Sequence, residues 1–502
     1  MTQPEIERIK AGIRRLIPEV VLRSAETLGY ELYAVGGCVR DPLLGRSITD
    51  VDLAVVGDAP RLAQETAKAF GSGQVAIYAR FGTAMLMIEE RKIEFATARR
   101  ESYTAESRKP SEVIPVPIEE DLKRRDFTIN AIALGLVGSR AGQILDLFDG
   151  LADLQRRLLR TPLEPEHTFS DDPLRMLRAI RFAAEYGLTI EERTWQGILN
   201  NCPRLKIVAA ERIGEEIWRM MAGADPVRSM QLMIKSGMMQ ELVPEVTNMA
   251  GVEQFGIHHH KDVLAHSLKV LQGTIEKSAD PVVRLAALLH DVGKPGTKKY
   301  DPDLGWTFHG HELLGAKMAW RVGKRLRLGR ESLERVGKLI RLHMRPVNLT
   351  AEGVSDSALR RLMVETGDDL DDQLLLCRAD ITTANPKLVK SYLANFEEMA
   401  RKMSDVEARD RMRQFQSPIR GEEIMTLCGL EPGPEVGALK ERIEDAILDG
   451  IIPYDYEAAK QFLLTIKDDI LNTQPQLLAQ ERRNRAASRR RITASFKFPN
   501  KD

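Results

Sequence analysis

Two aspartates separated by one residue, Asp50 and Asp52, are the first side chains in this sequence that could do chemistry. They belong to the segment GGCVRDPLLGRSITDVDLAVV, residues 36–56. Residues two apart in a β-strand point to the same side of the sheet, so both carboxylates would lie on one face. A divalent metal ion binds hard oxygen ligands arranged in this way. Taken alone, such a pair is more often a solvated strand end.

The glycine pair Gly36 and Gly37 predicts a tight turn between a strand that ends at Val35 and a helix that begins near residues 39–41. Backbone N–H groups at the start of a helix bind phosphate because the positive end of the helix dipole points at them. With Arg40 nearby, this turn would hold a triphosphate. A phosphate turn that leads into a metal site is the layout needed for two-metal transfer of a nucleotidyl group to a hydroxyl.

Two further segments carry charges that suit a nucleotide. In EEDLKRRDFTINAIAL, residues 119–134, three adjacent cations and Asp126 precede an apolar run that we expect to be helical. In FSDDPLRMLRAIRFAAEYG, Asp172 and Arg175 are three residues apart and would share a helix face, where an acceptor and a donor could pair with a base edge. Each segment alone also fits an ordinary role, a helix cap or an internal ion pair.

Composition limits the class of protein. A chain of 502 residues is expected to form roughly three domains. Lys and Arg together number 73, as do Asp and Glu, so nucleic-acid binding must come from local patches. Four scattered cysteines without a CxxC pair favour a reducing compartment, the cytoplasm. The sequence has no signal-peptide pattern and no apolar run of the ~18 residues that a membrane span needs.

The pattern along the chain predicts an α+β protein. Short alternating or β-branched runs dominate the first 150 residues, and helical periodicity dominates from about residue 152. All histidines except His167 fall between His258 and His343. We expect these parts: a head at 1–150, a neck at 151–225, a body at 226–400, a tail at 401–475 and a basic C-terminal segment at 476–502.

The motifs occur in a familiar order: GGxVRDxLLGxxxxDxD, RRDFTINAIA, DLFDGLADLxxxxLR, DDPLRMLRAIRFAA and AAERIGEEI. They resemble class II tRNA nucleotidyltransferases, the CCA-adding enzymes, and the related bacterial poly(A) polymerases, with high specificity over about residues 30–225 and more loosely to about 470. The resemblance implies a polymerase β-like head, a mixed sheet with helices, followed by an all-α neck, HD body and tail. It also implies Mg2+-dependent addition of CTP and ATP to the acceptor arm of tRNA without a nucleic-acid template.

The resemblance implies roles for individual residues. Asp50 and Asp52 would be catalytic metal ligands, and Asp172 with Arg175 would be the amino-acid template that pairs with cytosine and then adenine. Asp171 stands where the family usually has Glu. The nucleotide-binding set would be Gly36, Gly37, Arg40, Asp41, Arg124, Arg125, Asp126, Asn130, Asp172, Arg175 and Arg178.

Four more residues of the head and neck receive expectations. Glu94, in a predicted strand, is a candidate third carboxylate. Glu211, Arg212 and Glu216 match the last neck motif, for which we expect a role in helix packing.

The segment RRESYTAESRKPSEVIPVPIEEDL bears on substrate choice. It is similar to the flexible loop that CCA-adding and A-adding enzymes possess and CC-adding enzymes lack, with Glu106 and Arg108 at the positions of its usual acid and arginine. FGTA, within YARFGTAMLMI, also looks like the tRNA enzymes. Six arginines among residues 482–491 instead fit recruitment of general RNA, as in the poly(A) enzymes. We prefer CCA addition and keep poly(A) polymerase as the alternative.

The histidine-rich segments, which include HHHKDVLAHSLKVL, LAALLHDVGKPGTK and LLLCRADIT, resemble a metal-dependent HD domain. His266, His290, Asp291 and Asp380 would be its ligands for Mg2+, Mn2+ or Ni2+. His309, His311 and His343 would suit a second metal or the phosphate. We expect hydrolysis of 2',3'-cyclic phosphates or 2'-phosphates as a second activity.

Two other function classes compete. The HD module could carry the main activity while the head only docks RNA, or the chain could be a catalytically dead RNA-binding protein. Asp50 and Asp52 weigh against both, because carboxylates repel the phosphate backbone that a simple binder must hold. The sequence leaves the oligomeric state open.

Overall fold

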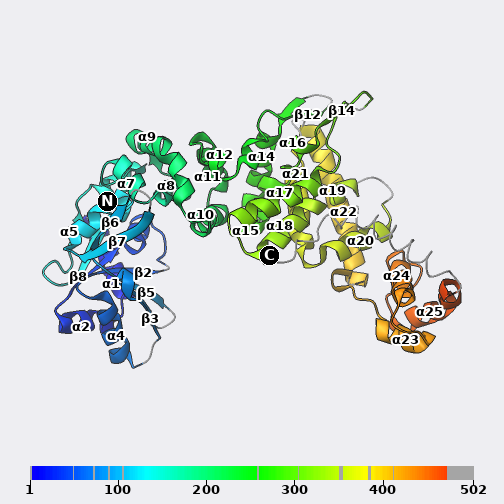
Figure 1. Cartoon of the computed structure of the whole chain (residues 1–502), viewed down its shortest axis with the longest axis horizontal. Coiled ribbons are helices and arrows are strands. Elements are labelled where there is room, and N and C mark those ends of the chain that lie inside the picture. Colours follow the sequence, from blue (N-terminus) through cyan, green and yellow to red (C-terminus); the bar gives the residue numbers. More distant parts are fainter. Residues whose placement is uncertain are drawn as a thin grey trace. The chain divides into compact units, whose positions relative to one another are not determined.

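The computed structural model describes residues 3–48, 50–71, 74–88, 91–104, 107–256, 259–303, 305–349, 354–382, 386–410 and 412–471. The chain forms two compact units, Met1–Leu242 and Val243–Asp502, and each is treated by itself below (Figure 1). In the part of the chain that the structure describes, no helix combines the length and the apolar character that crossing a membrane requires.

A seven-stranded mixed sheet forms the centre of the head, in the order β3-β4-β5-β2-β1-β8-β9. Its strands are β1 (Glu31–Val35), β2 (Val51–Val56), β3 (Val75–Tyr78), β4 (Thr83–Ile88), β5 (Arg91–Thr97), β8 (Ile132–Val137) and β9 (Ile144–Asp146). The helices of the head are α1 (Gln3–Leu16), α2 (Glu19–Leu28), α3 (Gly37–Leu43), α4 (Ala59–Phe70) and α5 (Ile118–Lys123). β2 and β5 are parallel, and the other neighbouring pairs are antiparallel.

The apolar run that follows Asp126 is a strand, so the prediction of a helix there is wrong. Residues Thr128–Asn130 form one 3-10 turn, and β8 follows it between β1 and β9. All six residues of β8 are buried. A strand buried on both faces loses the alternation that identifies strands, and its sequence then looks like that of a buried helix.

The segment similar to a flexible loop contains an antiparallel hairpin, β6 (Arg99–Thr104) and β7 (Ser107–Pro115). Glu106 and the side chain of Arg108 lie outside the described residues.

Helices and two short strands make up the rest of the first unit: α6 (Gly150–Arg156), β10 (Leu158–Leu159), α7 (Pro165–Asp171), α8 (Leu174–Glu185), β11 (Thr189–Ile190), α9 (Glu192–Asn201), α10 (Ala210–Ala222), α11 (Pro226–Lys235) and α12 (Met238–Leu242). α11 packs against α8 and α10. The compact unit therefore continues to Leu242, beyond the neck boundary expected at residue 225.

The second unit is mostly helical. Its elements are α13 (Pro244–Thr247), β12 (Glu253–Gly256), β13 (His259–Asp262), α14 (Val263–Ile275), α15 (Pro281–Leu289), α16 (Lys294–Thr297), β14 (Lys299–Asp301), β15 (Gly305–Thr307), α17 (His311–Arg325), α18 (Arg330–Leu342), α19 (Met344–Asn348), α20 (Asp356–Thr366), α21 (Leu370–Asp380), α22 (Pro386–Asp410), α23 (Gly421–Cys428), α24 (Pro434–Leu448) and α25 (Tyr456–Leu471). The boundary expected at residue 400 falls inside α22. One apolar core joins residues on both sides of it, from Leu359 to Ile470. The basic segment 476–502 lies outside the described residues.

Candidate functional site

Three carboxylates gather where β2 begins. Asp50 directly precedes β2, Asp52 is its second residue, and Glu94 is the register partner of Asp52 on the parallel strand β5. Burial and the nearby charges of Glu94 and Asp50 raise the pKa of Asp52 to about 6. Carboxylates that repel one another in this way favour a bound cation, and oxygen ligands suit Mg2+. The residues present therefore fit the expected metal.

The Gly-Gly turn lies beside these carboxylates. Gly36 has φ 67° and ψ −128°, a conformation that residues with a Cβ avoid. A Cβ placed on Gly36 would lie 3.6 Å from both Asp52 Oδ2 and Arg125 Nη1. The helix α3 begins at Gly37, slightly earlier than expected. The Cys38 thiol donates to the carbonyls of Val35 (3.0 Å) and Asp52 (3.4 Å), which ties the turn to both strands.

Asp121, which the sequence analysis missed, holds the arginine pair. It is buried on α5; its Oδ1 accepts from Arg124 Nη2 at 2.6 Å, and its Oδ2 accepts from Arg125 Nη2 at 3.0 Å. Burial opposes ionisation, but the two guanidinium groups outweigh it and lower the pKa of Asp121. An acid three and four residues before two arginines on a helix is the signal that could have revealed it.

Arg40 is buried and bonded inside the protein. Its Nε donates to Asp41 Oδ1 (2.8 Å), its Nη1 to Asn130 Oδ1 (2.6 Å) and its Nη2 to the Tyr186 hydroxyl (2.6 Å). The guanidinium also lies 4.5 Å from the centre of the Tyr186 ring. This geometry favours a role in bracing the glycine turn against α8 over direct contact with a triphosphate.

Both oxygens of Asp126 have partners. Oδ1 accepts from the Phe127 N–H and from Asn130 Nδ2, each at 2.9 Å, and Oδ2 accepts from Arg178 Nε at 2.8 Å. Burial opposes the charged form, but Arg178 and Asn130 outweigh it and lower the pKa of Asp126 to about 2. A ribose hydroxyl would have to share these oxygens.

Three arginines of α8 follow one another at intervals of three. Arg175 Nη2 donates to the carbonyl of Arg124 at 2.7 Å, so α8 contacts the arginine pair. Arg178 bonds to Asp126, and Arg181 Nε donates to Glu216 Oε2 at 2.7 Å. The buried ion pair of Glu216 agrees with the packing role expected for the last neck motif.

Asp172 does not share a helix face with Arg175, and that expectation is wrong. It caps the C-terminal end of α7 with an extended backbone, φ −138° and ψ 99°, outside α8. Pro173 explains this, because a residue before proline is excluded from the helical conformation by steric clash. Asp172 Oδ2 instead accepts from Arg212 Nη2 at 3.0 Å.

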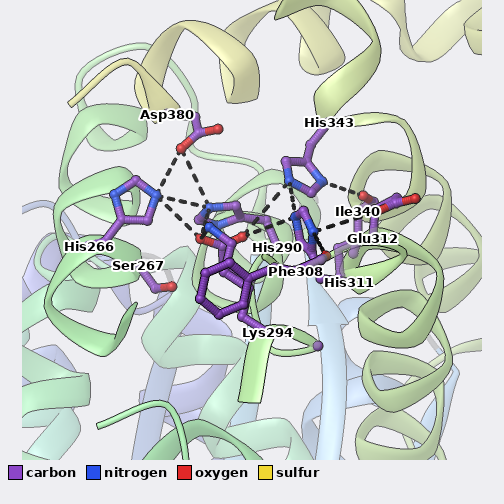
Figure 2. Close-up of polar contacts among 12 residues, drawn as sticks. His266, Ser267, His290, Lys294, Phe308, His311, Glu312, Ile340, His343 and Asp380 are labelled. Carbon is purple, nitrogen blue, oxygen red and sulfur yellow. Dashed lines mark hydrogen bonds and ion pairs between the residues drawn. The ribbon is translucent and has the colours of Figure 1, made fainter. Parts of the chain in front are cut away.

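The histidine module brings its ligands together from the ends of five helices. His266 lies on α14, His290 and Asp291 follow α15, His311 begins α17, His343 follows α18 and Asp380 ends α21. They form two groups of possible metal ligands: His266, His290 and Asp380, and Asp291, His311 and His343 (Figure 2). His309 belongs to neither group.

Asp291 links the two groups. Its Oδ2 lies 3.2 Å from His290 Nε2, and its Oδ1 lies 3.4 Å from His311 Nε2. In each group two imidazole Nε2 atoms face each other at 3.2 Å, His266 with His290 and His311 with His343.

The Nδ1 atoms set the tautomers. His290, His311 and His343 each place Nδ1 within 2.9 Å of a backbone carbonyl. A carbonyl only accepts, so Nδ1 carries the proton and Nε2 is turned toward the cluster, the usual arrangement of metal-bound histidine. Burial opposes the charged form of His290, but Asp291 and Asp380 outweigh it and raise its pKa to about 10. The carboxylates thus demand positive charge here, which a divalent cation would supply.

Family models match the chain in three places: the poly A polymerase head domain at residues 32–160, the probable RNA and SrmB-binding site of polymerase A at 187–249, and the HD domain at 263–385. An A-adding tRNA nucleotidyltransferase from Deinococcus radiodurans is 32% identical over 84% of this chain and 93% of that protein. The chain belongs to the tRNA nucleotidyltransferase family. A CC-adding tRNA nucleotidyltransferase from Thermus thermophilus is also 32% identical, over 86% of this chain and 93% of that enzyme.

Solved structures of tRNA nucleotidyltransferases share the fold. The CCA-adding enzyme of Bacillus stearothermophilus in complex with CTP has a TM-score of 0.62 at 24% identity, covering 93% of this chain and 99% of that one. A tRNA nucleotidyltransferase complexed with a primer tRNA and an incoming ATP analog has a TM-score of 0.55 at 25% identity, covering 76% and 98%. The predicted α+β class and the order of head, helical region and HD domain are confirmed in this tRNA nucleotidyltransferase.

Proposed function

We propose that the chain adds CCA to the 3' end of tRNA from CTP and ATP, in a reaction that requires Mg2+. The observation that carries this proposal is the meeting of Asp50, Asp52 and Glu94 with the Gly36 turn and Arg125 at the interior strands β2 and β5 of the sheet. Metal ligands and a phosphate cradle are needed at the same place for nucleotidyl transfer.

In this reaction the tRNA 3'-oxygen forms a bond to the α-phosphorus, the bond from that phosphorus to the pyrophosphate oxygen breaks, and the hydroxyl proton is lost to solvent. Asp50 and Asp52 would hold the Mg2+, which supplies Lewis-acid stabilisation of the developing charge. The backbone at Gly36 and Gly37 would bind the triphosphate, with Arg125 beside it.

Base selection would come from Asp172 and Arg175. Arg212 holds the carboxylate of Asp172, and the Arg124 carbonyl holds the guanidinium of Arg175, so both groups are fixed before a nucleotide arrives. A fixed acceptor and donor select cytosine and adenine by their hydrogen-bonding edges.

The relatives add A, CC or CCA, so the product needs its own experiment. The segment with β6 and β7 is the feature that favours complete CCA addition over CC addition. A tRNA ending at its discriminator base, incubated with Mg2+ and each labelled nucleotide, should gain two C and one A and then stop. A long A tail would support a poly(A) polymerase, A alone on a CC-ended tRNA an A-adding enzyme, and no product would contradict the proposal.

We propose a second activity for the histidine module, hydrolysis of 2',3'-cyclic phosphates or 2'-phosphates. The supporting observation is the double ligand group around Asp291, which would hold Mg2+, Mn2+ or Ni2+. Water oxygen would bond to phosphorus while one bond from phosphorus to a ribose oxygen breaks, and that oxygen takes up a proton. Removal of the metal should abolish the hydrolysis, and activity that survives full removal would refute this proposal.

The proposal also covers the domains of the chain, its RNA partner and its location in the cell. We infer a nucleotidyltransferase head, a neck that continues past residue 225 to Leu242, an HD body and a tRNA-binding tail that shares one apolar core with it, with the acceptor arm of tRNA as the partner. Four cysteines without disulfides fit a cytoplasmic location.

A further inference from the structure

A short hairpin between α16 and α17 concentrates aromatic and basic side chains. Residues 294–308 contain three aromatic residues and three lysines, although aromatic residues make up only 5% of the chain. The hairpin consists of β14 and β15, and the residues after it lead directly into His311 of the metal cluster.

Two aromatic rings face solvent on this hairpin. Tyr300 and Trp306 are register partners, and their rings meet edge to face at 5.3 Å. Tyr300 is 65% exposed and Trp306 is 37% exposed. The Lys298 ammonium lies 4.5 Å from the centre of the Trp306 ring. Side chains of this size are usually covered, and two together form a platform on which a planar ring can stack.

Two further residues of the segment 294–308, Lys294 and Phe308, contact the metal cluster. The ammonium group of Lys294 lies 5.7 Å from the centre of the Phe308 ring and 2.6 Å from Asp291 Oδ2. The Phe308 carbonyl accepts from His311 Nδ1 at 2.9 Å (Figure 2). We name Tyr300, Trp306, Lys298, Phe308 and Lys294 the aromatic stripe. Its exposed part, Tyr300 with Trp306 and Lys298, is joined along the chain to Phe308, two residues after Trp306, and Lys294 lies beside Phe308 and Asp291.

We propose that the aromatic stripe binds the unpaired 3'-terminal nucleotides of an RNA whose terminal phosphate reaches the histidine cluster. Bases of any sequence stack on aromatic rings, and interleaved cations hold the backbone. The acidic residues of the hairpin, Asp301 and Asp303, lie at its turn, and Lys294 is the cation of this segment at the cluster, 2.6 Å from Asp291 Oδ2. Glu312, the carboxylate 3.5 Å from His311 Nδ1, lies beyond the hairpin at the start of α17. This inference rests on the phosphoesterase activity proposed above and names its substrate as single-stranded RNA ends.

The test compares two cyclic diesters on the full chain with Mn2+, Ni2+ or Mg2+. One is a short oligoribonucleotide with a 2',3'-cyclic phosphate, and the other is glycerol 1,2-cyclic phosphate, which has no base. The variant Tyr300→Ala/Trp306→Ala should raise KM for the oligonucleotide by about tenfold or more. It should leave kcat/KM for the glycerol diester within about twofold, because no ring stacks there. The single variant Trp306→Phe, which keeps Tyr300 and an aromatic ring at position 306, should have a KM for the oligonucleotide close to that of the wild type.

Tyr392→Ala is the matched control, since Tyr392 is 50% exposed on α22 in the same unit. It should change neither substrate. Equal loss of both activities in the double variant would show damage to the cluster and overturn the inference. An unchanged KM for the oligonucleotide would overturn it while the phosphoesterase proposal stands. No hydrolysis of either diester by the wild-type chain would refute both.

Discussion

The carboxylate site of the head and the histidine cluster of the second unit both present ligands for a divalent metal ion, but they differ in ligand type and in exposure to solvent. The head gathers oxygen ligands from the start of β2 and from the neighbouring strand β5, where Asp50 is exposed and Glu94 half-exposed. The histidine cluster gathers nitrogen and oxygen ligands from five helix ends, and His290, Asp291 and His343 are almost fully buried. An open site of hard ligands suits a large polyphosphate substrate, and an enclosed mixed site suits a tightly held metal.

The sharpest way to separate the two sites is to remove one carboxylate. Asp52→Ala should lower the rate of nucleotide addition by at least about a thousandfold, because it removes a ligand of the Mg2+ that would neutralise the charge on the reacting phosphates. Hydrolysis by the histidine cluster should stay unchanged. Labelled CTP incorporation and cyclic phosphate cleavage measure the two effects, and parallel loss of both would contradict independent sites.

The reverse experiment removes His290. His290→Ala should lower the rate of phosphoester hydrolysis by at least about a hundredfold and lower the metal content of the purified protein. CTP addition should persist. Elemental analysis and the two activity assays check this. His167→Ala is the control, because His167 is exposed and belongs to the first unit, whereas the histidine cluster belongs to the second. Unchanged metal content in His290→Ala would argue against a metal at this cluster.

Within the head, Asp121 is the residue whose loss should weaken nucleotide binding most. Asp121→Asn removes the charge that holds Arg124 and Arg125, and we expect kcat/KM for CTP to fall by about tenfold to a hundredfold, mainly through KM. Steady-state kinetics measure it. Glu120→Gln, on the same helix but at the surface, should have little effect. A fall in kcat with an unchanged KM would contradict the role of Asp121 in holding the arginines for nucleotide binding.

Acid should weaken the head through Asp126. Its pKa is about 2 in the folded chain and about 3.9 when unfolded, so its ionised form contributes about 2 kcal/mol above pH 4. This contribution is lost as the pH falls from about 4 to about 2. Hydrogen exchange of the β8 amides should follow that loss. In Asp126→Asn the free energy of opening, obtained after correction for the intrinsic pH dependence of amide exchange, should be lower and nearly constant across the same interval. An opening free energy that still falls in that variant as in the wild type would contradict the assignment.

The smallest effect is expected at Arg212. Arg212→Ala removes the ion pair that holds Asp172 Oδ2 and leaves the bond from the Leu174 N–H to Oδ1, so discrimination of CTP against UTP should fall by only about threefold to tenfold. Competition between the two nucleotides measures this. Arg219→Ala on the same helix breaks only a surface pair with Glu215 and serves as the matched control. If Arg212→Ala and Arg219→Ala discriminated CTP from UTP equally well, the ion pair between Arg212 and Asp172 would have no role in base selection.

The sequence predicted the strands and turn around Gly36, Asp50 and Asp52 because their signals are local. It placed β1, β2 and the change to helical structure after about residue 152 correctly. It failed at β8, where burial on both faces erased the strand period, and at Asp172, where Pro173 ends the helix. Cys38 and Tyr186 escaped notice because their roles come from partners that the chain brings close only on folding. Asp121 was missed although its partners are only three and four residues away.

The order and chemistry of the ligands are properties of the sequence: the carboxylates two apart, the His-Asp doublet at 290–291, and the histidines that follow. Tertiary structure decided which of them meet. It put Glu94 opposite Asp52 through a parallel strand pair, divided the cluster around Asp291, and left His309 outside. The reason is physical: spacing along a chain sets the face of one element, whereas distance between elements depends on packing that no local pattern records.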